Sequence, residues 1–259
     1  MQRTIFSSKS SKIWLLAGII SVAIIIAIMS MPEILEPPLA KYIVRSMGGP
    51  YWLLAVLIVG VIHGLKPDEH TWPITVSYGL MQRNVRGVIT AVSVFASALT
   101  LVWTLMSALV GELMGLLNTS VLDPYVDIIV GLTMIGGVAA YLVFGKHGGD
   151  HHDVKTADYR LIWIHGLAAA FGGDFFIVLI LTIAIVPMIT AGLSFLVGFM
   201  FGFGSWLAQT IIVLAIYKGI VKSVGDWGGV VAEAGRIALG ILGLFMIGLG
   251  VYSFFTPSG

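Results

Sequence analysis

The stretch WLLAVLIVGVIHGLKPDEHTWPITVSYGL, residues 52–80, decides the fold class of this chain. Its first half is continuously apolar, and an apolar run resumes over residues 72–80, after the ionisable segment HGLKPDEH of residues 63–70. A helix of about 20 mostly apolar residues crosses a hydrocarbon core about 30 Å thick. The stretch therefore predicts a membrane-spanning helix with an ionisable interruption at membrane depth.

The composition of the whole chain favours the same class. Of its 259 residues, 58% are hydrophobic and 10% are charged, and the mean hydropathy is +1.01, whereas a soluble domain carries about 25% charged residues. The chain has no cysteine, which excludes disulfides, thiolate metal sites, iron–sulfur clusters and cysteine nucleophiles. A net charge of +1 without a basic run argues against a nucleic-acid partner. The lipid bilayer is the expected partner.

Apolar windows of spanning length recur along the sequence, and we interpret the chain as one all-α polytopic membrane domain with about seven transmembrane helices. Their expected bounds are 13–31, 52–80, 88–117, 126–144, 161–186, 192–217 and 231–255. The first run follows several bases, as a secretory signal does. We expect it to be retained as a span because it is about 19 residues long and lacks a small-residue cleavage site.

Lysines and arginines in the loops predict the orientation, because cytoplasmic loops carry the excess of these residues. With the N-terminus inside, the outer segments hold only Lys41 and Arg45. The inner segments hold Arg3, Lys9, Lys12, Arg83, Arg86, Lys146, Lys155, Arg160, Lys218 and Lys222. We therefore expect a multi-pass protein of the cell (inner) membrane with a cytoplasmic N-terminus.

A short internal similarity predicts the internal organisation. The sequence Ile-His-Gly-Leu occurs at residues 62–65 in the second span and again at residues 164–167 in the fifth. By the expected topology, these two spans run in opposite directions, as in the three-plus-three inverted repeats of secondary transporters, whose substrate site lies at the repeat interface. The expected parts are a first span with outer loop (1–50), repeat one (51–145), a cytoplasmic His/Asp loop (146–160) and repeat two (161–259).

The segment HGLKPDEH is expensive at membrane depth, so it indicates an ion pathway rather than packing. Pro67 lacks an N–H and clashes with the carbonyl four residues earlier, so we expect a break between Gly64 and Pro67. Asp68 and Glu69 would then lie near the start of the continuing half-helix, where its dipole favours them. The alternative is a solvated cytoplasmic turn over residues 66–70.

The donors of this segment predict a metal site. Imidazole and carboxylate without thiolate suit nickel, cobalt, zinc, iron or manganese. The candidate ligands are His63, Asp68, Glu69 and His70. Lys66 is a candidate counter-charge for the acids when the site is empty; alternatively, its side chain extends to the headgroups and only fixes the depth of the break.

Two further segments carry candidate ligands. In the fifth span, His165 and Asp174 flank a glycine pair at 172–173, and they converge only if that pair bends or unwinds the helix; alternatively, His165 is a hydrogen-bonded core residue. The inner loop KHGGDHHD, residues 146–153, offers His147, His151 and His152 for weak metal capture. Its alternative is a plain polar loop.

These motifs carry a resemblance to a known family. HGLKPDEH resembles the second-span signature of the nickel/cobalt transporter family, within the LysE-like transporters. In that comparison, His63 and Asp68 match the His and the Asp of the family's metal motif. Glu69 occupies the position of the family's second His, and His70 follows one residue after that position. The stretch VGFMFGFGSWLAQT, residues 197–210, is similar to the family's glycine-phenylalanine motif, with Trp206 and Thr210 at positions of its acids.

We therefore expect a transporter of a divalent transition-metal cation, and the resemblance implies nickel or cobalt. The metal is the substrate, and no enzymatic activity is expected. An intramembrane metalloenzyme using the same residues is an alternative, but no His-Glu-x-x-His pair is present. A haem protein with His63 and His165 as axial ligands is another. The sequence leaves open the direction of transport and whether the chain forms a homo-oligomer.

Overall fold

A computed structural model describes residues 8–30, 36–47, 49–68, 70–112, 158–171, 173–189, 191–224 and 228–255, and the single positions 128, 132 and 135. All regular structure in these ranges is helical, which confirms the all-α class for this part of the chain. The helices are α1 (Ser8–Met29), α2 (Glu36–Met47), α3 (Trp52–Leu65), α4 (Trp72–Leu80), α5 (Val85–Glu112), α7 (Tyr159–Ala169), α8 (Gly173–Ile185), α9 (Phe195–Val224) and α10 (Gly228–Phe255). Three short 3-10 turns cover Gly49–Tyr51, Val186–Met188 and Ala191–Leu193.

Three of the described helices are long and apolar enough to cross a membrane. These segments are Ser10–Met29 in α1, Val85–Gly111 in α5 and Phe195–Ile220 in α9. A multi-pass membrane protein is the class that such helices fit. The expected fourth span, residues 126–144, lies outside the described residues except at three single positions.

The segment between the first two spans differs from the expected loop, because it contains the helix α2. Its sequence starts Glu-Pro-Pro, and proline suits the first turn of a helix since the N–H groups there have no intrahelical acceptor. Ala40 and Val44 are buried while Tyr42 is exposed, so one face of α2 is covered. That helix packs against α3 and α8.

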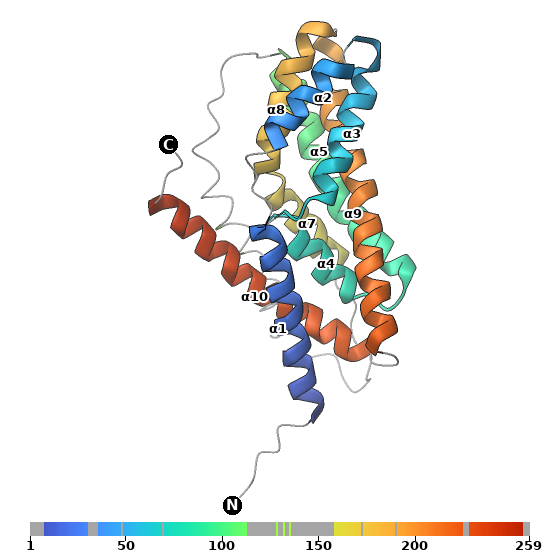
Figure 1. The fold of residues 1–259 in the computed structure, drawn as a ribbon, viewed down its shortest axis with the longest axis vertical. Coiled ribbons are helices and arrows are strands. Elements are labelled where there is room, and N and C mark those ends of the chain that lie inside the picture. Colours follow the sequence, from blue (N-terminus) through green and yellow to red (C-terminus); the bar gives the residue numbers. More distant parts are fainter. Residues whose placement is uncertain are drawn as a thin grey trace, which may run out of the picture.

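Helices α5 and α9 pack along each other, and α3 also packs along α9 (Figure 1). The pair α5 and α9 is antiparallel: Gly198 at the start of α9 meets Trp103, whereas Trp206, about two turns later, donates a hydrogen bond to Ser93. A Cβ at Gly198 would overlap the carbonyl group of Trp103. The absence of a side chain there allows the close approach of the two helices.

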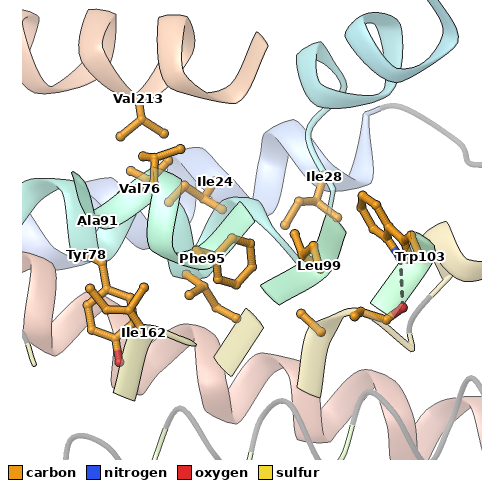
Figure 2. Packing of buried hydrophobic residues seen from close by; sticks show 14 of the residues in the cluster. Ile24, Ile28, Val76, Tyr78, Ala91, Phe95, Leu99, Trp103, Ile162 and Val213 are labelled. Atoms are coloured by element: carbon orange, nitrogen blue, oxygen red, sulfur yellow. Dashed lines mark hydrogen bonds between the residues drawn. The ribbon is translucent and has the colours of Figure 1, made fainter. Parts of the chain in front are cut away.

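Buried apolar side chains fill the space between these helices (Figure 2). The cluster joins residues far apart in the sequence, including Ile24, Ile28, Val76, Tyr78, Phe95, Leu99, Trp103, Ile162 and Val213. Close packing of this kind leaves few voids, so a buried ring cannot move without displacing its neighbours.

Each of the expected second and fifth spans consists of two helices. The second is α3 followed by α4, and the fifth is α7 followed by α8, so neither is continuous. In Figure 1 the chain descends from α3 to α4 and ascends from α7 to α8, so the two broken segments run in opposite directions. The expected break between Gly64 and Pro67 is confirmed, because α3 ends at Leu65. In the fifth span, α7 ends at Ala169 and α8 begins at Gly173.

Candidate functional site at two helix breaks

The break in the second span follows from Pro67. Lys66 precedes it and takes an extended conformation (φ −69°, ψ 132°), as the residue before a proline favours. The backbone N–H of Lys66 still donates to the carbonyl oxygens of Ile62 at 3.1 Å and His63 at 3.0 Å. The helix therefore ends where the carbonyl of His63 would otherwise meet the proline ring.

The carboxylate of Asp68 shapes the turn that leads into α4. Its Oδ2 accepts hydrogen bonds from the backbone N–H groups of His70 at 2.9 Å and Thr71 at 2.8 Å, and its carbonyl accepts one from Trp72 at 3.1 Å. Its Oδ1 accepts no hydrogen bond from the described residues. Asp68 thus lies near the start of the half-helix, as predicted, while Glu69 lies outside the described residues.

Three of the ionisable residues at this break, His63, Asp68 and His70, form one buried electrostatic cluster. His63 is 0% exposed and Asp68 and His70 are each 1% exposed, while Lys66 is half-buried. His70 Nδ1 lies 3.9 Å from Asp68 Oδ1, and His63 and Lys66 also interact electrostatically with Asp68. The alternative of a solvated turn is therefore wrong for Asp68 and His70.

The imidazole of His63 lies among aromatic side chains from two other helices. The ring of Phe201 on α9 is 5.0 Å away between centroids, and the ring of Trp103 on α5 is 6.2 Å away in an edge-on arrangement. Trp103 and Phe201 also touch each other, with centroids 5.1 Å apart, and all three rings are fully buried. These contacts fix the position of the imidazole at the junction of α3, α5 and α9.

The second buried histidine, His165, lies on α7 just before the break of the fifth span. Its Nδ1 is 2.7 Å from the hydroxyl oxygen of Tyr78 on α4, and the two rings stack 5.5 Å apart. The half-helix after one break is thereby joined to the helix before the other. The backbone of Asp174 belongs to α8, but its side chain lies outside the described residues, so the predicted convergence with His165 stays a prediction.

The break of the fifth span leaves a carbonyl group that another helix satisfies. The last carbonyls of a helix have no intrahelical donor. Ala170 caps the end of α7, and its carbonyl accepts a hydrogen bond of 3.0 Å from Nε1 of Trp103 (Figure 2). The same indole thus contacts His63 at one break and the backbone at the other.

The glycine-phenylalanine stretch of the sixth span serves helix packing in the described structure. Gly204 lies against the backbone of α3, and Gly198 and Gly202 lie against α5. Trp206 Nε1 donates to Ser93 Oγ at 3.0 Å, and Gln209 Nε2 lies 3.4 Å from Ser205 Oγ. The oxygen atoms Oε1 of Gln209 and Oγ1 of Thr210 are buried without a hydrogen bond from the described residues.

The candidate ligands do not all meet. Among the residues that the structure describes, no group of three His, Asp or Glu side chains is close enough to hold a metal ion together. The predicted ligand Glu69 and the accessory loop residues His147, His151 and His152 lie outside the described ranges. Their part in the site stays a prediction.

Two residues of this region, Trp103 and Tyr78, were not predicted from the sequence. Each is an aromatic residue with one polar atom inside an apolar helix, and such residues usually find a hydrogen-bond partner when buried. That signal marks them as candidates. Their partners lie 67 and 87 residues further along the chain, which no local pattern reveals.

Comparison with known proteins gives no assignment: no protein-family model, no curated protein sequence and no solved structure matches this chain.

Proposed function

We propose that this chain is a membrane transporter of a divalent transition-metal cation, which it binds as substrate at the break of the second span. The observation that carries the proposal is the burial of His63, Asp68 and His70 in one electrostatic cluster. Ionisable groups inside a membrane are costly, and they characteristically mark ion pathways. The resemblance of residues 63–70 to nickel/cobalt transporters makes nickel or cobalt the preferred substrate.

The donor types support a borderline transition metal. Two imidazoles and one carboxylate are the available side chains, and the chain has no thiolate. Asp68 uses Oδ2 for the turn, which leaves Oδ1 for a cation. Because the described ligands do not gather around one point, we propose that they close around the cation on binding, with Glu69, His165 and Asp174 as further donors.

The packing of the helices supports an inverted repeat. In an inverted repeat, spans two and three correspond to spans five and six. Helix α3 then corresponds to α7 and helix α9 to α5, and the pairs α3–α9 and α7–α5 are both in contact. The same correspondence relates the pair α4 and α9 to the pair α8 and α5, and both of these pairs are in contact. It also relates the pair α4 and α5 to the pair α8 and α9, which are in contact too. Alternating access in such proteins is a movement of one repeat against the other around the site. The charge distribution favours a cytoplasmic N-terminus.

The competing metalloenzyme and haem hypotheses have less support. For the metalloenzyme, the sequence has no His-Glu-x-x-His pair, the usual ligand pattern of such zinc enzymes. For haem, the ring of His63 is enclosed by Trp103 and Phe201, and that of His165 is stacked on Tyr78. A Soret band in the purified protein would support the haem hypothesis.

Flux measurements with purified protein in liposomes test the proposal. Nickel, cobalt, zinc, manganese, iron and magnesium are offered singly, and the metal that crosses the membrane is counted. We expect saturable flux of nickel or cobalt, and its loss in His63→Ala. A matched control is Thr182→Val, which removes a buried hydroxyl that donates to the carbonyl of Val178 within α8. Wild-type flux in His63→Ala, or no flux of any metal in the wild type, contradicts the proposal.

A further inference from the structure

One side chain, Trp103, touches both helix breaks. Its ring lies edge-on to the imidazole of His63, with centroids 6.2 Å apart, and its Nε1 donates to the carbonyl of Ala170 at 3.0 Å. The residue is 0% exposed and lies near the middle of α5, between the two broken segments. Among the described contacts, no other indole joins the two breaks in this way.

The indole is suited to transmit a displacement because it is one rigid plane. The edge facing His63 cannot shift alone, since Phe201 packs against the same ring at 5.1 Å. Close packing does not absorb such a shift. Movement of the imidazole therefore alters the hydrogen bond to the carbonyl of Ala170, the residue that caps α7, in the last turn of a helix, where carbonyls lack intrahelical donors.

We propose that Trp103 is a positioning residue that couples the two breaks, so that a cation bound at His63 changes the backbone of the fifth span at Ala170. This inference rests on the proposed transport function. The coupling makes binding in one repeat alter the other, which alternating access requires. Trp103 need not touch the cation to do this.

The substitution Trp103→Phe separates coupling from binding. It keeps an aromatic ring beside His63 and removes the Nε1 donor to Ala170 together with part of the indole ring; the control variant Trp206→Phe makes the same change in volume. We expect the dissociation constant for nickel or cobalt, measured by calorimetry, to stay within about threefold of the wild type, while the maximal flux falls about tenfold, the upper effect of losing one buried hydrogen bond. Equal losses of affinity and flux, or unchanged flux, overturn the coupling.

A second tryptophan provides the matched control. Trp206 on α9 makes the same kind of bond from Nε1, also 3.0 Å long, but to Ser93 Oγ within the α5–α9 interface rather than to a break. We expect Trp206→Phe to leave maximal flux within about twofold of the wild type, because its hydrogen bond does not reach either helix break. If Trp206→Phe lowers maximal flux as much as Trp103→Phe does, the loss of any buried indole hydrogen bond is enough to lower flux. That result overturns the specific coupling role of Trp103.

A measurement without metal keeps the coupling testable if the chain transports nothing. The protein has no cysteine, so Phe171→Cys places a single thiol beside Ala170 at a position 39% exposed in the native chain. The rate of labelling by a water-soluble thiol reagent is measured in nanodiscs for this parent and three double variants. We expect Trp103→Phe and His63→Ala each to raise the rate about fivefold, as the loss of one buried contact loosens the break. Trp206→Phe should not change the rate.

The two readouts distinguish the hypotheses. If the wild type neither binds nor moves metal but the labelling rates change as expected, the proposed function fails and the coupling of the breaks holds. If His63→Ala does not change the rate while Trp103→Phe does, Trp103 only caps Ala170 and the coupling is overturned. Equal rates in all variants overturn it as well.

Discussion

The hydroxyl oxygen of Tyr78 lies 2.7 Å from Nδ1 of His165, so the half-helix after the break of the second span is tied to the helix before the break of the fifth. The bond has a chemical consequence for the proposal that His165 is a metal ligand. Metal-ligating imidazoles usually donate the N–H of their other nitrogen to a neighbouring acceptor, which fixes the tautomer. In the tautomer that carries its proton on Nδ1, His165 donates to the oxygen of Tyr78, and the lone pair of Nε2 is the one available to a cation.

The first prediction is that Tyr78→Phe weakens metal binding. Loss of such an outer partner usually lowers metal affinity about 10- to 100-fold, and calorimetric titration with nickel or cobalt measures the change. Tyr217→Phe, which removes the hydroxyl of another buried tyrosine on α9, is the control and should bind as the wild type does. Unchanged affinity in Tyr78→Phe would mean that His165 is a core residue and not a ligand.

The second prediction separates the two oxygens of Asp68. In Asp68→Asn, the remaining side-chain oxygen can still accept the N–H groups of His70 and Thr71, so the turn persists. The charge and the second oxygen are lost, so we expect flux to fall about 100-fold, as charge-assisted ligand contacts are worth about 1.5 to 3 kcal/mol, while the melting temperature stays near that of the wild type. Asp68→Ala removes the turn bonds as well and should also lower the melting temperature. If the Asn variant transports normally, Asp68 serves the turn alone.

The third prediction concerns the glycines of the repeated Ile-His-Gly-Leu sequence. A Cβ at Gly64 would overlap the carbonyl oxygen of Ser205, and one at Gly166 would lie 2.6 Å from the carbonyl oxygen of Phe95. Each change to Ala should destabilise the protein by about 1 to 3 kcal/mol, because backbone must shift, and thermal unfolding in detergent measures it. Gly18→Ala is the control: nothing lies within 4 Å of a Cβ there, so that variant should not lose stability. Unaltered melting of both variants would contradict the close approach.

The fourth prediction tests Lys66 as a counter-charge. Its ammonium interacts with Asp68 and competes with a divalent cation for the same carboxylate. Lys66→Met keeps much of the stem and removes the charge, so we expect tighter metal binding together with slower release and lower maximal flux. Lys66→Arg keeps the charge and is the control. If Lys66→Met retains wild-type affinity and flux, the side chain is only an anchor at the depth of the break.

The sequence alone predicted the features that depend on composition and local backbone chemistry. Hydropathy over about 20 residues gives the apolar spans, because a membrane helix must cover its own backbone polar groups along its whole length. Pro67 predicts the end of α3, since proline limits the backbone locally. The glycines at 172–173 only indicate a place where the fifth span could bend. The helix α2 escaped prediction because its hydrophobic residues cover only one face.

The tertiary structure decided which side chains lie together at the breaks. Asp68 and His70 are two residues apart, so their proximity was within reach of local reasoning. The pairs Trp103 with Ala170 and Tyr78 with His165 are separated by 67 and 87 residues, and they meet because α7 packs against α5 and α4. Backbone preferences act over a few residues and are encoded locally, whereas the neighbours of a buried ring depend on how whole helices pack. For this reason the sequence indicates which residues are candidate ligands, whereas the contacts that join the two helix breaks are decided by the packing of the helices.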